Sequence, residues 1–223
     1  MAGTLERLKT LESRENGWHQ VWGVELEPEW VDGYSSMRLK QGDARDMHFF
    51  EDEFFDVIVC SPSYGNRDSD RTGDWWDNAD RKTYAAALGR NVSPDSLCVP
   101  FEHPMYTIGH TLAWAESTRV LKTGGLFVLN VKNHIKNGQI VRCSQWHREV
   151  LRDLLRYKEI DDTSIPTKGR LSGENYEVRA EDVEKIYIFL KTEDTAFRVA
   201  SVKEQFNQLQ KEHLDAQNNK DNR

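Results

Sequence analysis

Two serines, a proline and a tyrosine follow one another in the segment Ser61-Pro62-Ser63-Tyr64, directly after an apolar run. The run, Val57 to Cys60, is rich in β-branched residues and too short for a helix, so it predicts a strand buried on both faces. Pro62 cannot continue a central strand. We therefore expect a polar loop, the Ser61–Tyr64 loop, at the carboxyl end of that strand, where open α/β sheets bind their ligands. An ordinary exit from a strand fits the same spacing.

Two carboxylates take comparable positions earlier in the chain. The segment from Val21 to Glu25 predicts a short strand, and Pro28 marks the first turn of a following helix. A carboxylate at the end of such a strand, as Glu25 is, suits a ribose because it accepts hydrogen bonds from both hydroxyls. Asp43 follows Gly42 at the end of a second expected strand. A solvated glutamate and a commonplace Gly-Asp turn are the alternatives.

The Ser61–Tyr64 loop resembles the Ser/Asp/Asn-Pro-Pro-Tyr/Phe catalytic loop of S-adenosylmethionine-dependent amino-methyltransferases that act on DNA. With the residues that follow, Gly-Asn-Arg, it resembles small methylase-like proteins of phages and prophages. The segment from Gly23 to Pro28 is similar to the ribose-binding motif of these enzymes, with Glu25 as the ligand. The resemblance also implies that Asp43 contacts the adenine amino group of the cofactor. Val120 to Asn130 resembles the helix-turn-strand unit that follows the catalytic loop.

The resemblance implies methyl transfer to an exocyclic amine, either cytosine N4 or adenine N6. Such an amine is a poor nucleophile because its lone pair is delocalised into the ring. Hydrogen bonds accepted by the Ser61 side chain, which also lies beside the cofactor, and by the Pro62 carbonyl favour the pyramidal geometry of attack. Tyr64 is expected to stack on the flipped base. Ser63 replaces the second proline of the family, so the loop lacks the stiffness of that ring.

The first cofactor motif of the family, a strand followed by Asp-Pro-Phe-Ala-Gly-x-Gly, is incomplete in this sequence. The chain opens Met1-Ala2-Gly3-Thr4, which leaves Gly3 as the residue expected to line the cofactor. We therefore expect a Rossmann-like methyltransferase sheet with helices on both faces, an antiparallel edge strand, and a first strand that is missing or abbreviated. Such a sheet exposes two neighbouring strand edges. A truncation, a misassigned start codon and a split gene are all consistent with this opening.

Length and composition favour one domain in a reducing compartment. The 223 residues predict a methyltransferase-like domain over 1–192 and a polar tail over 193–223, either helical or disordered. The three cysteines are isolated, and no histidine has partners at ligand spacing, so neither a disulfide framework nor a metal site is expected. No apolar run is long enough to cross a membrane, and no signal peptide opens the chain. A cytoplasmic location is expected, in a bacterial host if a phage encodes the protein.

Two regions are candidates for contacting DNA, although a net charge of −7 argues against strong non-specific binding. The polar segment 68–105 contains Trp75 and Trp76 among interleaved arginines and aspartates, which favours base stacking and phosphate contacts. A self-solvating loop fits it as well. The region from Lys132 to Arg156 is the most basic part of the chain, and an ordinary solvated helix face is its alternative.

These observations predict an S-adenosylmethionine-dependent DNA amino-methyltransferase. The alternative is a catalytically impaired DNA- or protein-binding module of the same fold, or one part of a split methyltransferase. A homodimer partner or a complementing subunit would then complete the sheet. A third interpretation keeps the chemistry and changes the substrate to RNA or to a protein side-chain amide, because related loops occur there.

Overall fold

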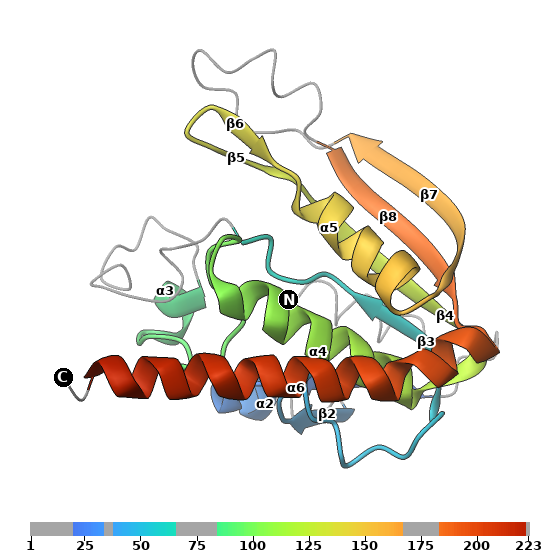
Figure 1. Ribbon diagram of the computed structural model, residues 1–223, viewed down its shortest axis with the longest axis horizontal. Helices are drawn as coiled ribbons and strands as arrows, with labels where there is room; N and C mark the ends of the chain where they lie inside the picture. Colours follow the sequence, from blue (N-terminus) through green and yellow to red (C-terminus); the bar gives the residue numbers. More distant parts are fainter. Residues whose placement is uncertain (1–19, 34–37, 66–83, 167–182, 222–223) are drawn as a thin grey trace.

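The computed structural model describes residues 20–33, 38–65, 84–166 and 183–221 (Figure 1). Gly3 and residues 68–83 of the segment 68–105, which include Trp75 and Trp76, lie outside these ranges. The elements in chain order are β1 (Trp22–Glu25), α2 (Pro28–Gly33), β2 (Arg38–Gln41), β3 (Phe55–Cys60), α3 (Tyr84–Leu88), α4 (Pro104–Val120), β4 (Leu121–Lys132), β5 (His134–Lys136), β6 (Gln139–Val141), α5 (Cys143–Glu149), the π-helical turn η3 (Val150–Leu154), β7 (Lys158–Pro166), β8 (Val183–Leu190) and α6 (Glu193–Asp221).

The main sheet is mixed, and the expected α/β fold class is confirmed. Four strands follow the order β3-β4-β8-β7, in which β3 and β4 run parallel while β8 is antiparallel to both of its neighbours. Strands β1 and β2 form a separate parallel pair. Within the described ranges, no strand pairs with the second edge of β1 or of β3. The sheet is therefore divided between these two strands.

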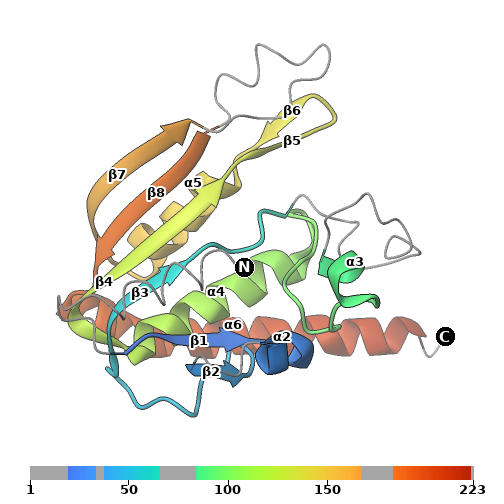
Figure 2. The same ribbon diagram turned by 180° about the vertical axis from the view of Figure 1, so that it is seen from behind.

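Aromatic packing holds the two parts of the sheet together. Met47, Phe50 and Val120 form a small buried cluster, on which Trp22 and Val24 of β1 and Phe55 and Ile58 of β3 pack. Figure 2 shows β1 beside β2, apart from the four-stranded sheet to which β3 belongs. The ring centroid of Phe50 lies 5.6 Å from that of Trp22 and 4.8 Å from that of Phe55, both edge to face. Such pairs stabilise a fold by about 1 kcal/mol each beyond the area they bury.

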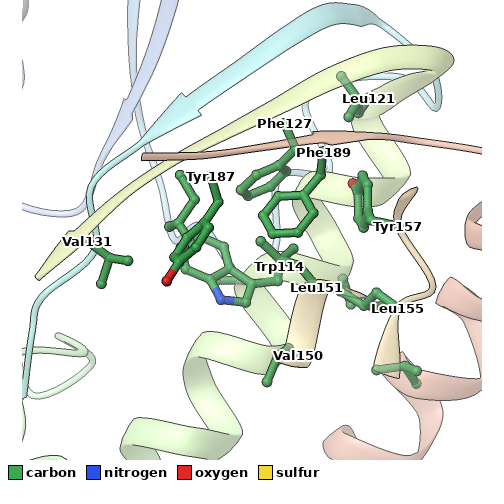
Figure 3. Close-up of a cluster of buried hydrophobic side chains, with 14 of the residues drawn as sticks. Trp114, Leu121, Phe127, Val131, Val150, Leu151, Leu155, Tyr157, Tyr187 and Phe189 are labelled. Atoms are coloured by element: carbon green, nitrogen blue, oxygen red, sulfur yellow. The ribbon is translucent and has the colours of Figure 1, made fainter. Parts of the chain in front are cut away.

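The principal core lies on one face of the four-stranded sheet. Alternate residues of β4, including Phe127 and Val131, are fully buried there, as side chains one position out of two point to the same face. Figure 3 shows Phe127 and Phe189 of the sheet directed toward Trp114 of α4 and Leu151 of η3. Residues of α5 and α6 join the same cluster. Burying each large apolar side chain contributes roughly 2 kcal/mol.

The face of β3 that points away from the principal core is more exposed than the sequence predicts. Val59 is 58% exposed, so the expectation that Val57 to Cys60 is buried on both faces is wrong. The register pairs Val59 with Val128 of β4, and these residues occupy the face opposite Phe127. An apolar run alone cannot tell a strand covered on both faces from one covered on a single face.

Two local elements are shaped by glycines with positive φ. Within Val120–Asn130, the segment that resembles a helix-turn-strand unit, the turn is a bulge inside β4, where the register with β3 shifts and Gly124 has φ +85°. Within the basic region, β5 and β6 form a hairpin. Its turn residues Asn137 and Gly138 both have positive φ, as a type I′ turn requires.

Helix α6 runs through most of the segment that the sequence predicts to be a helical or disordered tail. It packs along α4, as Figure 1 shows. Val202 is fully buried in the core, and Lys203 donates a hydrogen bond of 2.5 Å to the buried Glu116 of α4. The first half of α6 is thus part of the folded unit. No described helix is long and apolar enough to span a membrane.

Replacing Val202 with alanine tests how firmly α6 belongs to the core. The Val202→Ala variant removes two buried methyl groups and leaves a cavity, so its free energy of unfolding should fall by about 2 kcal/mol. The matched control is Phe197→Ala on the same helix, where the side chain is 86% exposed and the change should stay within about 0.5 kcal/mol. Urea denaturation measures both. Equal effects of the two variants would show that α6 is not docked.

Candidate cofactor and catalytic site

The structure places the predicted residues at strand ends. Glu25 is the last residue of β1, and Asp43 follows β2 by two residues. The parallel register aligns Glu25 with Gln41, and the Gly42 N–H donates to the Glu25 carbonyl at 2.9 Å. The two carboxylates therefore belong to adjacent strand ends. The Ser61–Tyr64 loop begins directly after β3, on the other part of the sheet.

The segment Ser93–Phe101, which precedes α4, joins these separate strand ends. Its Ser93 N–H donates to the buried Glu27 carboxylate at 2.7 Å, beside Glu25. The carbonyl of Asp95 accepts from the Arg45 guanidinium at 3.1 Å, next to Asp43. Two further bonds hold the Ser61–Tyr64 loop and the residue that follows it: the Ser63 hydroxyl donates to the carbonyl of Leu97 at 2.8 Å, and the Phe101 N–H donates to the carbonyl of Gly65 at 3.0 Å. One backbone segment thus sets the relative positions of the residues that follow β1, β2 and β3.

Glu25 is held in a desolvated position. The side chain is buried, and its Oε1 accepts a hydrogen bond of 3.0 Å from the Glu27 N–H. Burial raises the pKa of the Glu25 carboxyl above its usual range, because the charged form loses hydration that this bond restores only in part. A ribose with two hydroxyl donors would supply the missing partners. The position of the Glu25 carboxylate therefore suits the ribose-binding role that the sequence predicts.

Asp43 already has a partner. Its carboxylate accepts the Arg45 N–H at 2.8 Å and faces the Arg45 guanidinium, whose Nε lies 2.9 and 3.0 Å from the two oxygens. The Arg45 side chain is only 11% exposed, so this ion pair is largely withdrawn from water. An adenine amino group would have to share the carboxylate with Arg45. The cofactor role of Asp43 stays a prediction.

Ser63 is fixed although it lacks a proline ring. In addition to its bond to Leu97, its carbonyl accepts a hydrogen bond of 2.8 Å from the Tyr106 hydroxyl. The next turn depends on Gly65, which has φ +67° and where a Cβ would approach the Phe101 backbone to 2.9 Å. Tertiary hydrogen bonds and this glycine therefore hold the loop where the family pattern uses a second proline.

A buried chain of hydrogen bonds, here called the relay, runs from Trp114 through His147 and Tyr106 to the Ser63 carbonyl. The donor of each bond follows from the chemistry of the groups. The Trp114 indole can only donate, and its Nε1 lies 3.1 Å from Nδ1 of His147. Burial lowers the pKa of His147 well below its usual value, so the ring is neutral and Nε2 carries the proton. The Nε2–H donates a hydrogen bond to the Tyr106 oxygen at 2.9 Å, so the Tyr106 hydroxyl donates in turn to the Ser63 carbonyl.

Sequence reasoning missed Tyr106, Trp114 and His147 as supports of the loop. Tyr106 lies 41 positions from His147, and both occur in segments whose periodicity indicates only helices. A buried histidine inside an apolar stripe would have been the signal. Periodicity does not show which residue such a histidine contacts.

The charges of the basic region are largely neutralised within the chain. Much of the basic region is paired within the chain: Arg148 with Glu159, Arg152 with Asp153, and Lys136 with Glu102. Its contact with DNA stays a prediction. Burial raises the pKa of the Cys60 thiol, as expected for a core residue rather than a nucleophile. The described residues contain no cluster of three or more side chains able to hold a metal.

Neither a protein-family model nor a curated protein sequence matches the chain. Among solved structures, it is similar to a chain of the Haloferax volcanii complex that contains the Trm112 methyltransferase activator, with a TM-score of 0.49 at 14% identity over 86% of this chain and 79% of that one. It is also similar to the cytosine-N4-specific PvuII DNA methyltransferase, with a TM-score of 0.43 at 15% identity over 68% of this chain and 48% of that one. A SAM-dependent methyltransferase from Methanosarcina mazei is similar with a TM-score of 0.43 at 12% identity over 78% of this chain and 82% of that one.

This chain thus spans about half the length of the PvuII enzyme. All three TM-scores lie below 0.5, so the assignment of the site rests on the residues of this chain.

The Tyr106→Phe variant tests the support of the loop. It leaves the His147 Nε2–H and the Ser63 carbonyl without their partner, so the free energy of unfolding should fall by about 2 kcal/mol. Amide hydrogen exchange at Tyr64 and Gly65 should accelerate as well. The matched control is Tyr157→Phe, which removes a buried hydroxyl bonded to Thr118 at 3.0 Å. It should lose stability without faster exchange in the loop, and faster exchange in both variants would contradict a specific support.

The Glu25→Gln variant tests the desolvated carboxylate. Because the folded-state pKa of Glu25 is raised, its proton stabilises the native state below the unfolded pKa, and this contribution is lost as the pH rises through the folded pKa. Glutamine has no such charge and can still accept from the Glu27 N–H. The variant should therefore be more stable than the wild type at pH 7, with a difference that shrinks toward pH 4. Urea denaturation at both pH values measures it, and a less stable variant at pH 7 would contradict it.

Proposed function

We propose that this chain is an S-adenosylmethionine-dependent methyltransferase whose acceptor is the exocyclic amine of a DNA base, cytosine N4 or adenine N6. The observation that carries the proposal is the Ser61–Tyr64 loop: it follows β3 directly, exposes the Ser61 hydroxyl, and is fixed at Ser63 from two sides. This combination of an exposed acceptor on a rigid backbone suits an amine that must be held in one geometry.

The residues of the chain fit a sulfonium cofactor of this kind. The buried Glu25 carboxylate would hold the ribose hydroxyls, and Asp43, at the adjacent strand end, is the candidate for the adenine amino group. The cofactor supplies an electrophilic methyl group. Ser61 and the Pro62 carbonyl accept hydrogen bonds from the acceptor amine, which favours the pyramidal nitrogen needed for attack. The amine nitrogen gains the methyl group and must then lose a proton.

DNA is the proposed partner, and the target base must leave the stack to reach the loop. Tyr64 is the candidate for contact with that base. Its ring packs partly against the core and its hydroxyl lies 3.0 Å from the Ser61 Oγ, so the part of the ring that stays exposed would meet the base. Phage origin, with action inside a bacterial cell, belongs to the same proposal and derives from the Ser-Pro-Ser-Tyr-Gly-Asn-Arg run.

A second candidate function follows from the divided sheet. The described parts of β1 and β3 each have an edge without a pairing strand, and unpaired edges accept strands from other chains. The chain would then be one part of a methyltransferase completed by a complementing subunit or a second copy, or a binding module without catalysis.

Calorimetric titration of S-adenosylmethionine and S-adenosylhomocysteine into the purified chain separates these functions. Micromolar binding, about −8 kcal/mol, that is lost in Glu25→Ala is expected for the enzyme. Treated DNA should then contain N4-methylcytosine or N6-methyladenine, and Ser61→Ala should bind the cofactor but lower the rate at least about 100-fold. A folded chain that binds neither compound would overturn the stand-alone enzyme and favour the second candidate.

A further inference from the structure

We propose that Glu184 of β8 receives the proton that the acceptor amine releases, through the hydroxyls of Ser61 and Tyr64. This inference rests on the function proposed above and adds to it a route for the proton. Three groups from two distant parts of the chain form the route. The Ser61 Oγ lies 3.0 Å from the Tyr64 oxygen, and that oxygen lies 3.3 Å from Oε2 of Glu184, 120 positions later in the sequence.

The direction of the two hydrogen bonds follows from what each group can do. An ionised carboxylate only accepts, so the Tyr64 hydroxyl donates to Glu184. Its single proton is then committed, and the Tyr64 oxygen accepts the Ser61 hydroxyl. The Ser61 oxygen consequently uses its proton in the bond to Tyr64 and keeps its lone pairs as acceptors. An exposed Ser61 oxygen with free lone pairs is what the donated N–H of an amine requires.

The same arrangement balances the chemistry. When the amine nitrogen forms its bond to the methyl group, the carbon–sulfur bond of the donor breaks and the nitrogen becomes cationic. Its proton passes to the Ser61 oxygen, the Ser61 proton to the Tyr64 oxygen, and the Tyr64 proton to the Glu184 carboxylate. The products are the neutral methylamine and a protonated Glu184, which returns its proton to water. No oxidant or further reactant enters.

The fold holds Glu184 in place for this role. Its strand β8 is paired on both sides, with Lys132 of β4 and Ile165 of β7 directly opposite Glu184. Tyr64 is half-buried, and burial raises the pKa of its hydroxyl to about 12, so it conducts the proton as a neutral phenol rather than as a phenolate. In the proposed reaction Ser61 touches the amine and Tyr64 the base, whereas Glu184 acts only through these two residues.

The experiment compares Tyr64→Phe and Glu184→Gln with a matched charge control, Glu51→Gln in the exposed loop before β3. Tyrosine labelled with ¹³C at Cζ reports the hydrogen bond of each phenol by NMR, whether or not the chain is active. The Tyr64 signal, identified by its loss in Tyr64→Phe, should shift in Glu184→Gln and stay in place in Glu51→Gln.

In steady-state methylation of DNA, Tyr64→Phe and Glu184→Gln should each lower kcat about 100-fold, within the range for loss of a proton acceptor, with little change in the KM of the cofactor. The double variant should be no slower than either single one, because both break one route. An unchanged Tyr64 signal in Glu184→Gln, or an unchanged kcat in an active enzyme, would overturn the proton route alone. A wild-type chain that binds the cofactor but transfers no methyl group would overturn the proposed function and the route together.

Discussion

The candidate site depends on one irregular segment, Ser93–Phe101, because the sheet itself does not join its two parts within the described residues. A continuous parallel sheet would fix its strand ends through ladder hydrogen bonds. Here the ends of β1, β2 and β3 are instead tied to one segment by bonds to Glu27, Arg45 and Ser63 and to the backbone of Gly65. Each bond contributes only about 1 kcal/mol, yet together they determine whether Glu25 and Ser61 face a common ligand.

The polar groups behind the loop are placed so that each has a partner. Trp114 can only donate and Ser63 offers only a carbonyl to the relay, so the intervening His147 and Tyr106 must each donate in one direction. A network with a donor-only group at one end and an acceptor-only group at the other has no alternative orientation. Fully satisfied, it rigidifies the core, whereas any member left unpaired would be costly in this surrounding.

Much of this could be predicted from the sequence, and the failures have definite physical causes. Local signals were sufficient for β3, for the exit at Pro62 and for the strand ends at Glu25 and Asp43, since apolar runs and proline act on neighbouring residues. The hairpin at Asn137 and Gly138 also had a local signal, the Asn-Gly pair, which outweighs the polarity of its flanks.

Contacts between distant segments could not be predicted in this way. The exposure of Val59 depends on what covers the second face of the sheet, and no feature of its own run encodes that. Glu184 precedes the apolar run Ile186–Leu190, which indicates a strand, but such a run does not show that Tyr64 lies at the Glu184 carboxylate. The carboxylate of Asp43 likewise looked available from its turn, whereas the structure commits it to Arg45 two residues later.

The serine at position 63 shows why loop rigidity in this chain is conditional on the rest of the fold. A proline restricts its own backbone covalently, whether or not the surrounding protein is formed. Ser63 obtains its restriction from Leu97 and Tyr106, which are in place only when the segment before α4 and the first turn of α4 are docked. The geometry of the Ser61–Tyr64 loop is therefore coupled to the core around His147, and whatever strengthens that core also orders the groups that would hold the acceptor amine.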